Sequence, residues 1–166
     1  MSASQPSALE RLVDALTLAG IAFLRTHHAP VYTSAEAAAV RGVSLHSGAK
    51  ALILKGGDSF LMVVLPADLV LDSHAVREML GSKRLRFASK EEVSTLTGLT
   101  PGSIPPFGSL FGLPTICDDR LSENERINFN AGSHTDSLQM ACADYLQYES
   151  PRIARVGKPN DESAAN

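Results

Sequence analysis

At 166 residues, 44% of them apolar and 20% charged, the chain is long enough to bury a core and too apolar to be disordered. Its net charge of −3 excludes a global positive field, so a nucleic-acid partner would be contacted through a few local residues. The sequence has no apolar run that could span a membrane, no signal-peptide pattern, and two cysteines that lack metal or redox spacing. We therefore predict a cytoplasmic protein without membrane contact, with one domain over residues 1–156 and a polar, disordered tail over residues 157–166.

Capping boxes mark the start of three predicted helices. In each box a Ser or Thr is followed three residues later by a Glu, so that side chains and backbone N–H groups at the helix start satisfy one another. A glycine then ends each helix. The boxes are Ser7 with Glu10, Thr33 with Glu36 and Ser89 with Glu92, and the helices end at Gly20, Gly42 and Gly98. A fourth helix is predicted to begin at Asp72 or Ser73 and to end at Gly81.

A hairpin is the central predicted element of the sheet. Two apolar, β-branched-rich runs, 48–55 and 59–65, flank a Gly-Gly-Asp turn that supplies the positive φ angles of a tight reversal. Shorter strands are predicted at 21–25, 84–88, 113–118, 127–131, 137–140 and 151–156, with a helix near 141–148. Strands occur both in hairpins and singly between helices, so the pattern favours an α+β fold with a mixed sheet and helices packed around it.

Three polar or glycine-rich features are candidates for catalytic or ligand-binding roles. Lys50 stands at the mouth of the first hairpin strand, where it is either an exposed strand end or an anion anchor that faces a pocket. The loop 100–109, with two glycines and three prolines, is suited to binding a carboxylate or a developing oxyanion through backbone N–H groups, or is a plain surface connection. His134 follows a Gly-Ser kink and is either a donor or general acid–base, or merely solvated.

Common catalytic signatures are absent from the sequence. There is no P-loop, dinucleotide-binding, nucleophile-elbow or His-Glu-x-x-His pattern, and the histidines and cysteines lack metal-ligand spacing, so we predict neither a metal nor a cofactor. The pair His27-His28 is interpreted as a solvent-facing strand end. Lys83, Arg84 and Arg86 either contact phosphates or form the solvated side of an edge strand.

Four motifs in order resemble the YbaK/prolyl-tRNA synthetase-associated editing domains. They are His28–Ala37, the strand Lys50–Lys55, the loop Gly102–Pro106 extended by Phe107-Gly108, and Phe129–His134. The resemblance runs from about residue 27 to residue 156. It implies a central mixed, partly barrel-like β-sheet surrounded by helices. It also implies a free-standing hydrolase that acts in trans on mischarged aminoacyl-tRNA and binds the acceptor end of the tRNA.

The resemblance also implies roles for individual residues. The strand lysine of the family, here Lys50, is required for activity, the Gly-x-x-x-Pro loop positions the aminoacyl ester, and a histidine at the position of His134 lines the pocket of alanine-editing members. We therefore expect catalytic roles for Lys50, Gly102 and His134. Substrate binding is expected from Tyr32, Ser103, Ile104, Pro105, Pro106, Phe107, Gly132 and Ser133.

The amino acid removed is only partly defined. Cysteine-editing members have a different loop and lack the histidine, and some alanine-editing members have Asn where this chain has Ala51. Alanine, serine, threonine and 2-aminobutyrate on tRNA(Pro) are the candidates. A monomer is the default expectation, and a synthetase is a further candidate partner. The alternatives are a non-catalytic module that binds an aminoacyl-nucleotide or a tRNA acceptor end, and hydrolysis of another small ester or amide.

Overall fold

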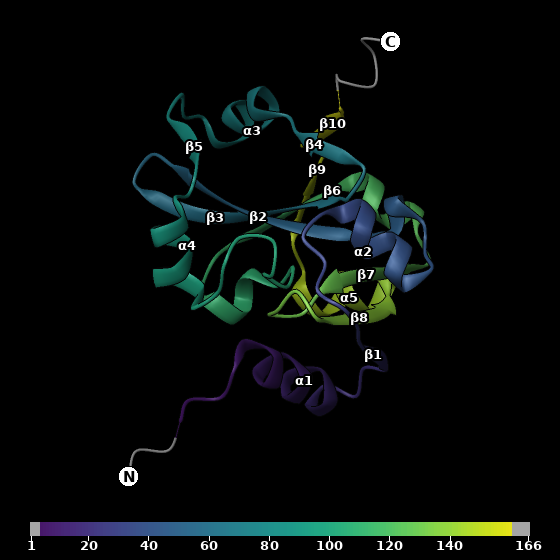
Figure 1. The fold of residues 1–166 in the computed structure, drawn as a ribbon. Coiled ribbons are helices and arrows are strands. Elements are labelled where there is room, and N and C mark those ends of the chain that lie inside the picture. Colours follow the sequence, from purple (N-terminus) through teal and green to yellow (C-terminus); the bar gives the residue numbers. More distant parts are fainter. Residues whose placement is uncertain (1–3, 161–166) are drawn as a thin grey trace.

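The computed structural model describes residues 4–160 and has an α+β fold around a five-stranded mixed sheet (Figure 1). The strand order is β5 (Leu85–Phe87), β2 (Ala49–Gly56), β3 (Ser59–Pro66), β6 (Thr115–Asp118) and β9 (Arg152–Ala154). The hairpin strand β2 is antiparallel to both β5 and β3, whereas β3, β6 and β9 run parallel. The predicted α+β class with a central mixed sheet is confirmed.

A second sheet packs against the first. It is antiparallel, with the order β1 (Phe23–His27), β8 (Asp136–Ala141) and β7 (Arg126–Asn130). A single parallel bridge between Gly48 and Asn128 joins its β7 edge to the start of β2. The two sheets therefore meet at the strand end that carries Lys50.

The C-terminal segment differs from the prediction. Residues 157–160 were expected to begin a disordered tail, but Gly157–Pro159 form β10, which pairs with β4 (Leu69–Leu71), a strand that the sequence did not predict. The boundary prediction at residue 156 was wrong because Gly157 is buried and its backbone N–H donates to the buried Asp118 carboxylate (2.7 Å). The rest of the predicted tail, 161–166, lies outside the described residues.

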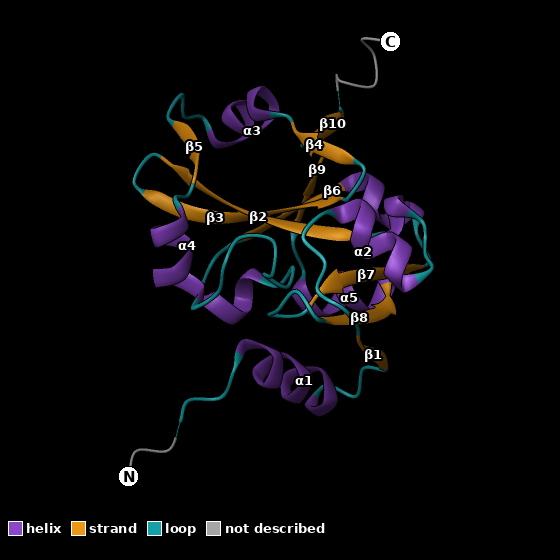
Figure 2. Ribbon diagram, viewed as in Figure 1, coloured by secondary structure: helices purple, strands orange, loops and turns teal. Residues whose placement is uncertain are grey.

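The helices begin and end close to the predicted positions (Figure 2). They are α1 (Ala8–Leu18), α2 (Ser34–Arg41), α3 (Ser73–Leu80), α4 (Lys90–Thr97) and α5 (Cys142–Glu149), with short 3-10 turns at Leu45–Ser47, Gly108–Phe111 and Asp119–Glu123. Reciprocal capping boxes form at Ser7 and Ser89, and the Thr33 hydroxyl accepts from the N–H of Glu36. No helix within residues 4–160 is long and apolar enough to cross a bilayer.

The core has two parts, one on each face of the central sheet. Because side chains alternate along a strand, Ile53 joins the larger cluster between the two sheets, and its neighbour Leu54 joins the smaller cluster with Val76 of α3. In Figure 1, α3 and the β4–β10 pair lie on one side of the central sheet, and β7, β8 and then α1 lie on the other.

One edge of β2 stays open where the site is found. The strand β5 pairs with β2 only over Leu54–Gly56, and the last contact is the Ala88 N–H with the Ile53 carbonyl (2.9 Å). Over residues 49–52 the edge of β2 opposite β3 therefore faces α2 and the end of β7 across a cavity.

Candidate active site

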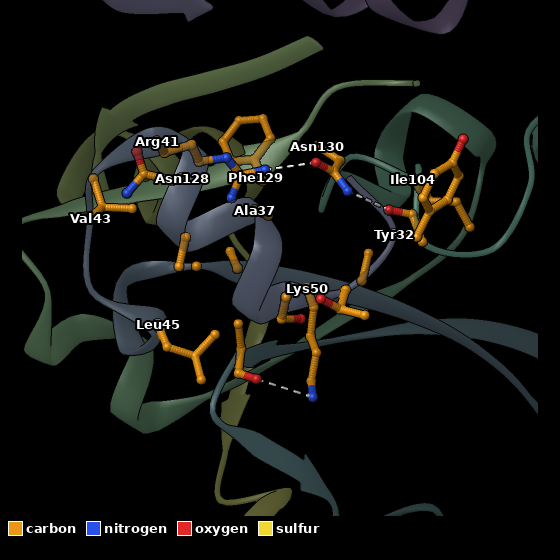
Figure 3. A pocket seen from close by; sticks show the side chains of 18 of the residues that line it. Tyr32, Ala37, Arg41, Val43, Leu45, Lys50, Ile104, Asn128, Phe129 and Asn130 are labelled. Carbon is orange, nitrogen blue, oxygen red and sulfur yellow. Dashed lines mark hydrogen bonds between the residues drawn. The ribbon is translucent and has the colours of Figure 1, made fainter. Parts of the chain in front are cut away.

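A cavity of about 170 Å³ lies between α2, the start of β2, the end of β7 and the loop Gly102–Ile104 (Figure 3). Much of its wall is made of small side chains from α2 and β2, namely Ala37, Ala38, Ala49 and Ala51. The polar and charged groups on the wall include Arg41, Lys50, Asn128 and Asn130. Of the predicted site residues, Tyr32, Lys50, Gly102 and Ile104 are brought together here.

Lys50 lies on the cavity wall, partly buried. Its ammonium group donates to the carbonyl of Ala67 at 3.5 Å, and in Figure 3 its side chain points away from Arg41. Burial lowers the pKa of Lys50, and the negative charge of Asp68 partly opposes this shift. Lys50 therefore lines a pocket, and its role as an anion anchor stays a prediction.

Arg41, the last residue of α2, has a role that the sequence did not reveal. Its Nε donates to Ser137 Oγ (2.9 Å) and its Nη2 donates to Asn130 Oδ1 (2.7 Å). Asn130 Nδ2 in turn donates to the carbonyl of Gly102 (2.6 Å). Burial lowers the pKa of Arg41 to about 10. No role for Arg41 was predicted from the sequence, because partners 89 and 96 positions away give no local signal.

The Gly102–Pro106 loop is held from inside the protein. Gly102 has φ of +89°, which favours glycine, and the Ser103 hydroxyl donates to the Thr100 carbonyl (2.8 Å). Tyr145 donates its phenol hydrogen to the carbonyl of Pro106 (2.6 Å). These contacts fix the loop, so that its Gly102 and Ile104 side reaches the cavity.

The expected pocket-wall role of Phe107 was wrong. Its side chain is fully buried and packs edge-on against Phe129, Tyr145 and Tyr148. Burying a phenyl ring among aromatic neighbours is favourable, and it leaves the ring behind the loop rather than in front of it. Three other expected substrate-binding residues of the loop, Ser103, Pro105 and Pro106, are likewise buried and outside the cavity lining.

His134 lies at the rim, behind a residue that lines the cavity. Its Nδ1 is 3.1 Å from the Val31 carbonyl, so Nδ1 carries the hydrogen and donates it, and Nε2 is 3.4 Å from Thr100 Oγ1. Its ring contacts the ring of Tyr32 with centroids 4.8 Å apart. A Cβ added to Gly102 would lie 3.5 Å from its Cε1. His134 thus supports Tyr32 and Gly102 and is itself outside the lining of the cavity.

The turn before His134, formed by Gly132 and Ser133, also lies outside the cavity lining. Gly132 has φ of +97°, and a Cβ there would lie 3.3 Å from the backbone nitrogen of Leu9 in α1. Ser133 Oγ donates to the Asp136 carboxylate (2.8 Å) and accepts from the Asp136 N–H (3.0 Å). Both residues therefore shape the turn outside the cavity lining, and direct substrate contact by them stays a prediction.

Groups that the sequence set aside lie away from the cavity. Cys117 and Cys142 are buried, and burial raises the pKa of Cys117 to about 12. Arg86 lies on the edge strand β5 and makes two hydrogen bonds with the carboxylate of Glu92 in α4 (2.7 and 2.9 Å). This supports the interpretation of Arg86 as part of the solvated side of an edge strand. Within residues 4–160 there is no group of three His, Cys, Asp or Glu side chains that could hold a metal ion.

The two histidines before α2 differ in surroundings. His27 is exposed, as predicted. His28 is partly buried: its Nδ1 donates to the carbonyl of Ala29 (2.8 Å), and its Nε2 accepts from the Ser137 hydroxyl (2.7 Å). His28 therefore belongs to the same hydrogen-bond chain as Arg41, which the solvent-facing interpretation missed.

Comparison with known proteins identifies the family of the chain. The model of the aminoacyl-tRNA editing domain matches residues 28–148, which span every element that lines the cavity. The chain belongs to this family. The predicted resemblance is thereby confirmed.

Relatives and solved structures agree with this assignment. The chain is 34% identical over 149 residues to the multifunctional Ser/Thr-tRNA deacylase ProXp-y of Escherichia coli K12, covering 87% of this chain and 89% of that protein. It is 33% identical over 132 residues to a proline–tRNA ligase of Shouchella clausii, covering 76% of this chain and 23% of the ligase. The crystal structure of a candidate trans-editing enzyme for prolyl-tRNA synthetase superposes with a TM-score of 0.80 at 23% identity, over 93% of this chain and 99% of that one, and shows the shared fold.

Proposed function

We propose that this chain is a free-standing aminoacyl-tRNA deacylase that hydrolyses the ester of mischarged tRNA in trans. The observation that carries the proposal is the small, alanine-walled cavity with two cationic side chains, Lys50 and Arg41, on its wall. Among residues 4–160, neither side chain forms an ion pair with a carboxylate. Such a cavity suits a small aminoacyl group attached to an anionic nucleotide.

The reaction needs a placed water and a stabilised oxyanion. The water oxygen attacks the ester carbonyl carbon, the tetrahedral intermediate collapses, and the ribose oxygen leaves with a proton, giving the free amino acid and uncharged tRNA. We assign Lys50 to the phosphate or ester region of the terminal adenosine and the backbone N–H groups of Gly102 and Ile104 to the developing oxyanion. His134 supports Tyr32 at the rim. Loss of one oxyanion donor would raise the barrier by about 3 kcal/mol.

The substrate is a small amino acid, with serine and threonine ahead of alanine and 2-aminobutyrate. Support comes from the polar groups on the cavity wall and from similarity to a relative that is a Ser/Thr-tRNA deacylase. Similarity to a proline–tRNA ligase supports tRNA(Pro) as the carrier and a synthetase as a partner. We retain a monomer that acts in the cytoplasm and contacts the tRNA acceptor end.

The decisive experiment is hydrolysis of Ala-, Ser-, Thr-, Cys- and 2-aminobutyryl-tRNA by the wild type and by Lys50→Ala. We expect turnover of one or two of these tRNAs and a loss of at least about 100-fold in the variant. Lys55→Ala is the matched control, because Lys55 lies on the same strand, outside the cavity, with its ammonium 5.5 Å from the Phe60 ring. Absence of turnover with charged-tRNA binding retained would support the binding-module alternative instead.

A further inference from the structure

Arg41 is a charged group on the cavity wall that makes no ion pair with any residue that the structure describes. Within the described residues 4–160 no carboxylate pairs with it, and its hydrogen bonds go to the neutral Asn130 and Ser137. These bonds use the hydrogen of Nε and one hydrogen of Nη2, so Nη1 is the guanidinium nitrogen that makes no hydrogen bond to the described residues. A pKa of about 10 keeps the side chain cationic at neutral pH.

The guanidinium is held rigidly by satisfied partners. The Ser137 hydroxyl gives its hydrogen to His28 Nε2 (2.7 Å) and uses its oxygen to accept from Arg41. Asn130 accepts from Arg41 and donates to the Gly102 carbonyl. Because the plane of the guanidinium is fixed from two sides, Nη1 is a pre-organised donor that loses little entropy when it binds.

The chemistry of Nη1 restricts what can lie against it. A guanidinium donates hydrogen bonds and accepts none, and its charge repels the α-ammonium group of an aminoacyl ester. The ligand group beside it must therefore be a hydrogen-bond acceptor without positive charge, and in the aminoacyl part of the substrate such acceptors are oxygens. Lys50, which points away from Arg41 in Figure 3, is the cation available for phosphate, and the alanines around Arg41 leave room for a small side chain.

We propose that Arg41 donates from Nη1 to the side-chain hydroxyl of a seryl or threonyl group and is the residue that selects hydroxylated over apolar amino acids. This inference rests on the proposed deacylase function and names its substrate class. Ala is Ser, and 2-aminobutyrate is Thr, with the side-chain hydroxyl replaced by hydrogen. Either apolar group would therefore leave the charged Nη1 donor without a hydrogen-bond acceptor. A site built to bond a hydroxyl rejects an analogue that lacks it.

Matched substrate pairs test the proposal. We expect wild type to favour Ser- over Ala-tRNA, and Thr- over 2-aminobutyryl-tRNA, in kcat/KM. In Arg41→Met both ratios should fall by about 10- to 100-fold, as for a lost hydrogen bond to a charged group, mainly through the hydroxylated substrates. Arg41→Gln, which keeps an N–H donor, should retain part of the preference. An equal loss on both members of each pair would overturn the proposal, since Arg41 would then act only through Asn130 and Gly102 or on phosphate.

A binding measurement separates this proposal from the deacylase function. Amide-linked 3′-seryl- and 3′-alanyl-amino-adenosine cannot be hydrolysed, and their affinities for wild type and Arg41→Met can be compared by calorimetry. Tighter binding of the seryl analogue that disappears in Arg41→Met would support hydroxyl recognition even if no tRNA is turned over. Equal affinities in the wild type, or no binding of either analogue, would overturn it. Circular dichroism of both variants checks that they fold.

Discussion

Asp118, at the end of β6, and Arg41, at the end of α2, are both charged side chains drawn out of water, and their surroundings differ. Asp118 accepts from the backbone and guanidinium of Arg120 and from the N–H groups of Val156 and Gly157. Arg41 has two neutral partners and faces a cavity. A charge balanced within the protein holds chain segments together, whereas a charge left unbalanced on a cavity wall has binding capacity to spare for a ligand.

The largest expected effect is a loss of stability when the balanced charge of Asp118 is removed. Asp118→Asn removes the buried carboxylate charge that Arg120 and the N–H groups of Val156 and Gly157 stabilise, so the free energy of unfolding should fall by about 3 kcal/mol, measured by urea denaturation at pH 7. The ratio of Ser- to Ala-tRNA hydrolysis should not change, since Asp118 lies outside the cavity lining. A shifted ratio would show that the two regions are not independent.

Asp118→Asn also tests how the stability of the protein depends on pH. Burial alone would raise the pKa of Asp118, but hydrogen bonds from Arg120, Gly157 and Val156 bring it below its ordinary value. Its contribution to stability is therefore complete above the unfolded pKa of about 3.9 and is lost as the pH falls through the lower folded value. Asp118→Asn should lack this part of the acid-induced loss. Parallel stability–pH curves for the two proteins would contradict the assignment.

A smaller effect is expected at the loop end of the Arg41 hydrogen-bond chain. Gly102→Ala forces a side chain into φ of +89°, at a cost of about 1–2 kcal/mol, and should lower kcat/KM by about 10-fold because the carbonyl held by Asn130 moves. Gly98→Ala is the control: its φ is +73° with no atom within 4 Å of an added Cβ, and it ends α4 away from the cavity. Equal activity losses would remove the special role of Gly102.

The smallest effect concerns the stability of the unbalanced region. Arg41→Met gives up two hydrogen bonds to neutral partners but also removes a partly buried charge, so the free energy of unfolding should change by less than about 1 kcal/mol. Thermal unfolding of the variant beside Asp118→Asn measures the contrast. If Arg41→Met lost as much as Asp118→Asn, Arg41 would be a structural charge and the comparison would fail.

Local signals predicted most of the secondary structure. The capping residues at 7, 33, 72 and 89 start helices where expected, and Gly-Gly-Asp turns the β2–β3 hairpin, because caps and tight turns depend on residues a few positions apart. The strands β4 and β10 were missed since each has three residues and is defined by pairing with the other, 88 positions away.

The site was predicted in part for the same reason. Lys50 and the Gly102 loop stand out as local motifs, whereas Arg41 and Asn130 acquire their roles through contacts between distant segments. Phe107 was assigned to the wrong side of its loop, because a sequence motif does not state which face of a loop meets the core.

The capping box of α4 explains why there is room for a ligand at all. If β5 continued beyond the Ala88–Ile53 contact, its next residues would run along Ala49–Leu52 and complete the sheet. Instead Ser89 accepts from the N–H of Glu92, and the chain turns into a helix. An unfinished sheet edge is ordinarily a liability for association with other chains, and here α2 lies across it. The end of the three-residue strand β5 at Phe87 thus leaves the edge of β2 over Ala49–Leu52 to line the cavity.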